Sequence, residues 1–210
     1  MRRAIVVLVV GVLAWSAVPA SAGIPMPASS RFMGRSSMSW ARAWSQWALG
    51  DASNPLFAGL LDGDCGDLID GMFYMTAPID LGVELDCNVP AGVPILVSHA
   101  GFFVFADPGQ TDAQIEDMAD AGFTTVSNHL SLDGHALALT ATRTGAFDVI
   151  SEAGGFYDAI VGLGTGPIRT AVTGNFTLIH PLPPGDHTLE GAVLFTDAEN
   201  YSVTYHIHVG

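Results

Sequence analysis

Apolar and polar residues alternate along the last stretch of this 210-residue chain. From residue 201 to residue 209 every second side chain is apolar, and the residues between them are Ser, Thr or His. A period of two is typical of a β-strand with one buried and one exposed face. We expect this strand to form a closing hairpin with the segment that follows the turn at residues 183–186. Its apolar face consists of Tyr201, Val203, Tyr205, Ile207 and Val209.

Further short strands are predicted upstream, separated by Gly, Pro, Asn and Asp. They cover residues 72–79, 83–90, 93–107, 124–132, 135–143, 147–150 and 175–182. The strand at residues 93–107 is expected to break near His99, and Asp133 with Gly134 forms a hairpin turn. Residues 151–174 are rich in glycine and are predicted to form a long loop. This pattern indicates a mainly β protein, an antiparallel β-sandwich of immunoglobulin-like or jelly-roll-like form.

One predicted helix carries three tryptophans on a single face, Trp40, Trp44 and Trp47. We expect Ser37 or Ser39 to cap its start and Gly50 to end it. Large aromatic side chains are rarely left in water, so this face is expected to pack on the sheet. A platform on which carbohydrate or aromatic ligands stack is the alternative.

A second helix is predicted over residues 112–122, after a cap at Thr111 or Asp112. Its apolar stripe consists of Ile115, Met118 and Ala119. The mainly β domain is therefore expected to carry one or two short helices.

The first 22 residues have the pattern of a secretory signal peptide. Arg2 and Arg3 precede a short apolar run, and small residues end at Ala22, after which we expect cleavage. The run is too short for a good membrane span. Residues 23–37 are rich in Pro, Ser and Gly and are expected to be flexible, and residues 38–210 to form one domain. We therefore expect an exported protein, periplasmic or extracellular, with no membrane span after cleavage.

The predicted mature chain is strongly acidic. The sequence has no lysine, and the five arginines after residue 22 face 21 acidic residues, which leaves a net charge of −16 with histidine neutral. Such a surface repels nucleic acid and anionic lipid. The expected partner is therefore an extracellular or envelope component and not a nucleic acid.

The two cysteines, Cys65 and Cys87, are expected to form a disulfide, because an even count in an exported protein favours pairing. Free thiols are the alternative. Around Cys65 lie Asp62, Asp64 and Asp67, whose carboxylates could bind Ca²⁺. The spacing is not that of an EF-hand, and an Asp/Gly turn held by the disulfide is the other interpretation.

His206 and His208 are the second candidate metal ligands. They lie two residues apart on the final strand, so both side chains face the same way. If residues 197–199 form the turn of the closing hairpin, Glu190 lies beside His206. Two imidazoles and a carboxylate could bind Zn²⁺, Cu²⁺ or Fe²⁺. Ordinary surface histidines are the alternative.

Sequence motifs of common catalytic sites are absent: the chain has no G-x-S-x-G, no H-E-x-x-H and no phosphate-binding loop. No cofactor motif is present, with a transition metal or calcium as the open alternatives. The sequence therefore favours a non-catalytic binding or structural module, and a metal-binding protein or metal-dependent enzyme is the second hypothesis.

The chain also resembles a group of uncharacterised exported bacterial proteins. The resemblance rests on the Trp-rich helix, Asn54-Pro55, the Gly-x-Cys loop at Cys65, the Cys-x-Val-Pro-Ala-Gly segment from Cys87, and the Pro-Leu-Pro-Pro-Gly-x-His-Thr closing hairpin. It spans about residues 40–209 and implies a β-fold and export. No established activity comes with it.

Overall fold

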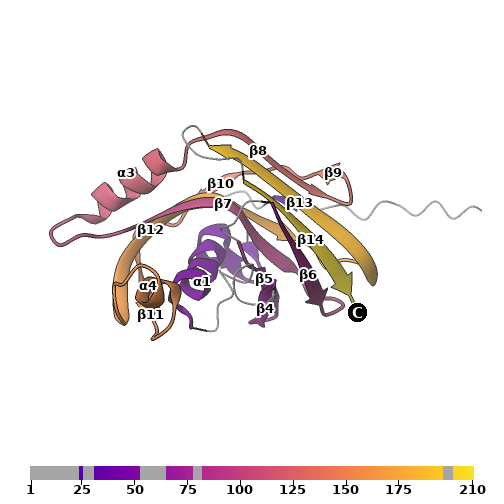
Figure 1. Ribbon diagram of the computed structural model, residues 1–210, viewed down its shortest axis with the longest axis horizontal. Coiled ribbons are helices and arrows are strands. Elements are labelled where there is room, and N and C mark those ends of the chain that lie inside the picture. The colour runs from indigo at the N-terminus through magenta and orange to yellow at the C-terminus, as the bar shows by residue number, and fades with distance from the viewer. Residues whose placement is uncertain (1–23, 26–30, 53–64, 78–81, 196–200) are drawn as a thin grey trace, which may run out of the picture.

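Two β-sheets form the body of the protein in the computed structural model, which describes residues 24–25, 31–52, 65–77, 82–195 and 201–210 (Figure 1). The first sheet has the order β1-β12-β7-β5-β4, and β10 and β11 also pair with β12. Its strands are β1 Ile24–Pro25, β4 Gly66–Ile69, β5 Met72–Met75, β7 Ile95–Phe105, β10 Ala141–Arg143, β11 Phe147–Ser151 and β12 Gly166–Ile179.

The second sheet has the order β6-β14-β13-β8-β9. Its strands are β6 Val83–Val89, β8 Thr125–Leu132, β9 His135–Ala136, β13 Gly185–Phe195 and β14 Tyr201–Val209. A separate small hairpin joins β2 Arg31–Phe32 to β3 Arg35–Ser36. The expected mainly β class with few helices is confirmed. Most strand pairs are antiparallel, but β5 with β7 and β6 with β14 are parallel.

The core between the sheets contains the apolar face predicted for the last strand. Val203, Tyr205 and Ile207 are all buried there, against residues of β5 and β7. The expected disulfide is confirmed: Cys65 and Cys87 are bonded, with their Cα atoms 5.3 Å apart. Because Cys65 precedes β4 of the first sheet and Cys87 lies in β6 of the second, the bond fastens the two layers to each other.

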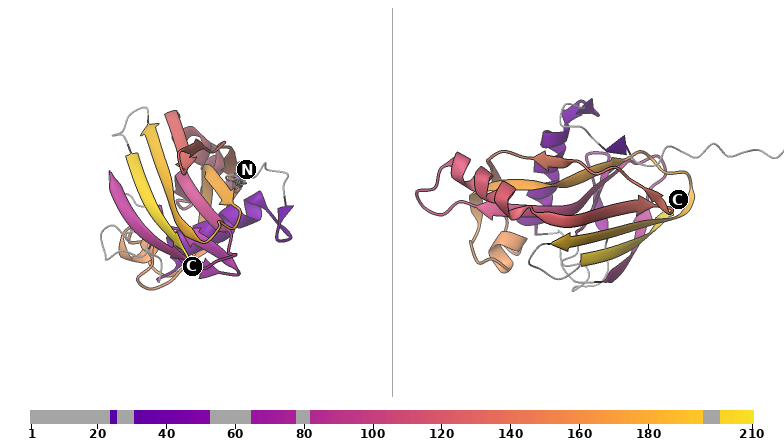
Figure 2. Two further views of the ribbon diagram at one scale, coloured as in Figure 1. Left: turned by 90° about the vertical axis from the view of Figure 1, so that its right-hand side faces the viewer. Right: turned by 90° about the horizontal axis from the view of Figure 1, so that it is seen from above.

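A second core lies on the opposite face of the first sheet, under helix α1 Ser37–Gly50. Figure 2 shows the second sheet and α1 on opposite sides of the first sheet. All three tryptophans of α1 are buried, as expected for a helix that packs on the sheet. The N-cap is Ser36, whose hydroxyl accepts a hydrogen bond from the Ser39 amide, so the predicted cap at Ser37 or Ser39 was wrong.

Helix α3, Asp112–Gly122, begins and ends where the sequence predicted it. Thr111 caps it in a capping box with Gln114. Ile115 and Ala119 are buried against β7 and β12, whereas Met118 is exposed and does not belong to the apolar stripe. None of the helices in the described ranges is long and apolar enough to cross a membrane.

The segment at residues 151–174 is not a loop throughout, contrary to the prediction. It contains the short helix α4, Phe156–Ala159, and from Gly166 it forms the first nine residues of β12, the longest strand. Residues 170–179 are buried at every position, because α1 and α4 cover one face of this strand while α3 and the second sheet cover the other.

The register of the closing hairpin differs from the expected one by two residues. Val193, and not Phe195, lies opposite Tyr201, so the connection is longer than a turn at residues 197–199. A shift of two keeps each side chain on its predicted face, which is why the apolar face was identified correctly. It moves Glu190 opposite Thr204, and places Thr188 opposite His206.

Candidate functional site

A pocket lies where β7 extends beyond its neighbour β5. The two strands pair only from Ile95 to Val97 of β7. From Ser98 onward, this edge of β7 has no strand partner within the described ranges, while its other edge stays paired with β12. Residues 98–100 are nevertheless buried, and the strand becomes exposed only at Gly101 and Phe102.

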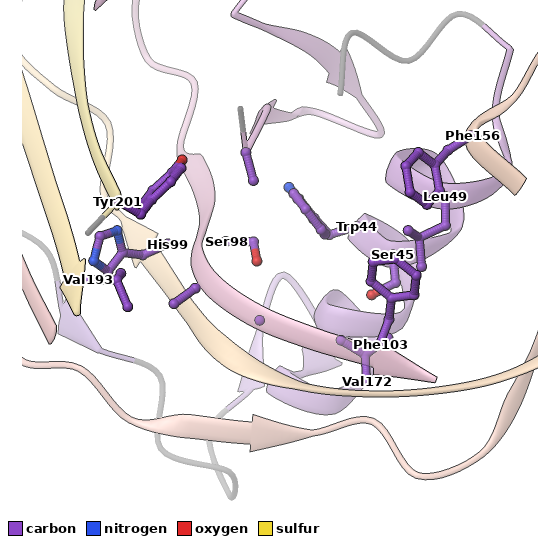
Figure 3. A pocket seen from close by; sticks show the side chains of 13 residues that line it. Trp44, Ser45, Leu49, Ser98, His99, Phe103, Phe156, Val172, Val193 and Tyr201 are labelled. Carbon is purple, nitrogen blue, oxygen red and sulfur yellow. The ribbon is translucent and has the colours of Figure 1, made fainter. Parts of the chain in front are cut away.

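The pocket has a volume of about 170 Å³ and is mostly apolar. In Figure 3, His99 lies beside Tyr201 and Val193 at one end, and Leu49 and Phe156 lie at the other. Trp44, Ser45, Ser98, Phe103 and Val172 also line it. It thus combines side chains from α1, β7, α4 and the second sheet, which lie far apart in the sequence.

A β-bulge places His99 at this site. Phe176 of β12 pairs with Ser98 and Asn175 pairs with Ala100, so His99 is the extra residue between them. A bulge bends the strand and redirects a side chain, and bulges are common next to functional sites. The predicted break near His99 is therefore a bulge within one continuous strand, from Ile95 to Phe105.

His99 carries a buried nitrogen without a partner. Its side chain is almost fully buried, and Nε2 lies 3.3 Å from the carbonyl oxygen of Ala192. A carbonyl only accepts, so Nε2 carries the proton and donates. Nδ1 is then a bare acceptor, and among the described residues it has no hydrogen-bond partner. Burial lowers the pKa of His99 and outweighs the hydrogen bonds of the imidazole with Ala192, Asn128 and His129, which act to raise it. The lowered pKa favours the neutral form.

Ser45 also has a buried polar atom without a hydrogen-bond partner among the described residues. It lies on the buried face of α1, directly after Trp44, and its Oγ is fully enclosed without a partner in the described part of the chain. Buried polar groups in folded proteins almost always have partners. Ser45 Oγ and His99 Nδ1 are two of nine buried side-chain atoms without a hydrogen-bond partner in the described ranges, and both lie on residues that line this pocket.

The predicted transition-metal ligands are not gathered into one group. His206 Nε2 lies 3.6 Å from Glu84, and His208 lies between Asp186 (2.8 Å) and Asp86 (3.6 Å). Glu190 instead lies within 3.4 Å of the Ser131 hydroxyl, on the strand beyond. The hydrogen bond to Asp186 raises the pKa of His208.

Within the described ranges no cluster of three His, Cys, Asp or Glu side chains could hold a metal ion. Of the predicted calcium ligands, Asp62 and Asp64 lie outside the described residues. Asp67 Oδ2 accepts a hydrogen bond of 3.0 Å from Trp47 Nε1, which ties the strand β4 to helix α1. The calcium and transition-metal sites stay predictions.

Comparison with known proteins gives only distant structural similarity. No protein-family model matches the chain, and no curated protein matches it in sequence. Three solved structures resemble it: amebosin (13% identity, TM-score 0.24, 60% of this chain and 89% of that one), a cysteine protease inhibitor from Entamoeba histolytica (12%, 0.22, 61% and 88%), and the inhibitor PbICP-C in complex with falcipain-2 (9%, 0.23, 70% and 97%). TM-scores this low do not establish a shared fold, and the resemblance to exported bacterial proteins stays a prediction.

The pocket could be predicted only in part from the sequence. The tryptophan pattern predicted that one face of α1 is buried, but nothing in that pattern distinguished Ser45, which follows Trp44, as a pocket residue. The strand pattern predicts a break near His99, but only the pairing with Asn175 and Phe176 of β12 shows that it is a bulge. His99 and Ser45 become a candidate site only when the fold brings them to one pocket.

Proposed function

We propose that this protein is an exported, non-catalytic binding module whose pocket at the open edge of β7 takes a small, largely apolar ligand. The observation that carries the proposal is a pair of buried atoms on residues that line a mostly apolar pocket: Ser45 Oγ and His99 Nδ1 have no hydrogen-bond partner among the described residues. Ligand sites typically have apolar walls and a few placed polar groups. Export rests on the signal-peptide pattern of residues 1–22.

The non-catalytic part of the proposal is supported by the state of the pocket's polar groups. A serine nucleophile needs a base within hydrogen-bonding distance, oriented by a third group. Ser45 Oγ has no such bond among the described residues, and His99 donates to a backbone carbonyl. The pocket therefore offers hydrogen bonds to a ligand without an activated nucleophile.

The proposal can be tested with simple apolar probes. Toluene, indole and octan-1-ol are titrated into the mature protein, and the side-chain N–H signal of Trp44 is followed by NMR. We expect at least one probe to shift this signal saturably. In the variant Ala77→Phe, a half-buried pocket residue is enlarged, and binding should weaken strongly.

The matched control is Ala141→Phe, which adds the same ring at an exposed position of β10. It should bind the probes like the wild type. The proposed function fails if none of the three probes shifts the Trp44 signal, or if Ala77→Phe binds as tightly as Ala141→Phe.

A further inference from the structure

We infer that the ligand group held in this pocket is a single ring that bears a hydrogen-bond donor, of which a phenol is the simplest example. The inference rests on the proposed function and names the chemical class of its ligand. Three features carry it: the pocket volume, the aromatic walls, and the bare acceptor of His99.

The volume fits one ring. The pocket measures about 170 Å³, and an apolar cavity of roughly 150 Å³ in another protein stays dry and binds benzene. A fused multi-ring compound would need more space than this. A single six-membered ring with one small substituent is therefore the size that fills the pocket.

The walls favour an aromatic ring. Phe103 and Phe156 pack edge to face with centroids 5.5 Å apart, and Trp44 packs in the same way on Phe176 at 5.7 Å. Because aromatic rings prefer such edge-to-face contacts at 4.5–7 Å, a further ring can join this set. A flexible alkyl chain would fill the same space without this geometry.

The polar end of the pocket, at His99, requires a hydrogen-bond donor on the ligand. Since His99 Nε2 donates to Ala192, Nδ1 offers only a lone pair. A ligand with an O–H or N–H can satisfy it, whereas an ether or a carbonyl oxygen cannot. The Ser45 hydroxyl can rotate to donate or accept, so it tolerates either kind of ligand atom.

A phenol ring could reach the pocket as a free small molecule or as the tyrosine side chain of a peptide. The edge of β7 that has no strand partner among the described residues lies beside the pocket, and an extended peptide can pair with an edge of this kind. Both sources share the ring and its donor, and the experiment separates them.

The test compares three probes of similar size by calorimetry and NMR. In p-cresol the ring carries a donor, in 4-methylanisole the same oxygen can only accept, and toluene has no oxygen. We expect p-cresol to bind roughly 3- to 10-fold more tightly than the other two, the effect of one hydrogen bond to a buried, otherwise unpaired acceptor. The variant His99→Leu should bind all three alike.

A direct readout does not depend on that variant folding. The ¹⁵N chemical shift of His99 Nδ1 should move on addition of p-cresol and stay unchanged with 4-methylanisole, because only the former donates to it. The variant Ser45→Ala should keep the preference for p-cresol, since it leaves His99 in place.

The outcomes separate this inference from the proposed function. If octan-1-ol binds more tightly than every ring, or if p-cresol and 4-methylanisole bind equally and neither moves the Nδ1 signal, the ligand class is wrong while the pocket still binds ligands. If no probe binds, the proposed function fails as well.

The source is assigned with acetyl-Gly-Tyr-Gly-amide, with the Phe peptide as its control. Tighter binding of the Tyr peptide than of p-cresol identifies a peptide ligand, and weaker binding a free phenolic compound. A Phe peptide that binds as tightly as the Tyr peptide would contradict the need for a donor.

Discussion

Gly191 of β13 lies directly against the imidazole of His99: a Cβ at position 191 would come within 2.5 Å of Cε1 and 2.6 Å of Nδ1. Both residues are buried between the two sheets. Only a residue without a side chain at position 191 leaves room for the imidazole beside the pocket. The place of His99 therefore depends on the second sheet as well as on the bulge in β7.

We expect Gly191→Ala to displace the imidazole and destabilise the protein. Overpacking of a filled core typically costs about 1–3 kcal/mol, which urea denaturation would measure. The p-cresol preference should also disappear, because His99 Nδ1 moves. The double variant Gly191→Ala/His99→Ala should recover part of the lost stability, because the effects of substitutions at contacting residues do not add.

The control for this variant is Gly101→Ala on β7. The nearest atom to its added Cβ is 3.7 Å away, so the methyl group fits without displacing a neighbour. It should change the free energy of unfolding by less than about 0.5 kcal/mol. If Gly191→Ala is as stable as this control, the imidazole of His99 can move aside without cost. In that case Gly191 does not determine the position of His99.

How far the fold follows from the sequence depends on how each strand is covered. The strand β14 has one buried and one half-exposed face, so its period of two was visible and its core face was predicted correctly. The strand β12 is buried on both faces between residues 170 and 179 and has no such period. Its glycines then suggested a loop, yet Gly174 is needed because its Cβ would lie 2.7 Å from the Ala100 carbonyl.

The candidate sites were less predictable than the fold, because they depend on the register of β13 against β14 and on which strand pairs with β7. The position of Glu190 relative to His206 depended on the length of one connection, and an error of two residues moved the carboxylate away from the predicted site. The role of His99 depends on pairing with Asn175 and Phe176, more than 70 residues further along the chain. No local pattern around a residue reveals such a long-range pairing.

Protein stability should depend on pH through His187 and Asp133. His187 Nδ1 donates to Asp133 at 2.7 Å, and Nε2 donates to the Pro183 carbonyl at 3.0 Å. Burial by itself lowers the pKa of His187, but these bonds outweigh it and raise the pKa above its ordinary 6.5. For Asp133, burial acts to raise the pKa, but bonds from His187 and Thr188 outweigh it and lower the pKa below 3.8.

The His187 contribution is therefore complete below pH 6.5 and is lost as the pH rises through the raised pKa. The Asp133 contribution is present above pH 3.8 and is lost as the pH falls through the lowered pKa. The pair should stabilise the fold most between these values. Asp133→Asn keeps a residue suited to the positive φ of this turn. It should lower the His187 pKa, seen by NMR titration, and flatten the fall in melting temperature between pH 6 and pH 8.

Transition-metal ions should leave the stability of the protein unchanged if it acts as the proposed metal-free binding module. His206 and His208 lie against the carboxylates of Glu84, Asp86 and Asp186 instead of forming a three-ligand group with Glu190. A metal ion that binds the folded protein, at a free concentration 100 times its Kd, would raise the free energy of unfolding by about 2.7 kcal/mol. A rise in melting temperature with Zn²⁺ that is lost in His206→Gln/His208→Gln would support the metal site and contradict the metal-free proposal.

Calcium needs a separate experiment, because its predicted ligands lie around Cys65 and not on β14. Removal of divalent ions with EDTA should leave the melting temperature unchanged, and so should Ca²⁺ added afterwards. A fall with EDTA that Ca²⁺ alone reverses, in the wild type but not in Asp67→Asn, would show that the acidic segment around Cys65 binds calcium.

The two tryptophans of α1 that donate hydrogen bonds to the first sheet should differ in their effect on stability. Trp44 Nε1 donates to the Met75 carbonyl at 2.9 Å in a buried setting, whereas Trp47 Nε1 donates to Asp67, which is half-buried. Trp44→Phe leaves a buried carbonyl without its donor, which costs about 1–3 kcal/mol. Trp47→Phe leaves a half-buried carboxylate that water can hydrate in place of the indole, so we expect its loss of stability to be smaller. The two variants remove the same atoms from neighbouring turns of one helix, so urea denaturation of the pair isolates the hydrogen-bond difference. Equal losses of stability would mean that the ring packing, and not the bond to Met75, holds α1 on the sheet beside the pocket.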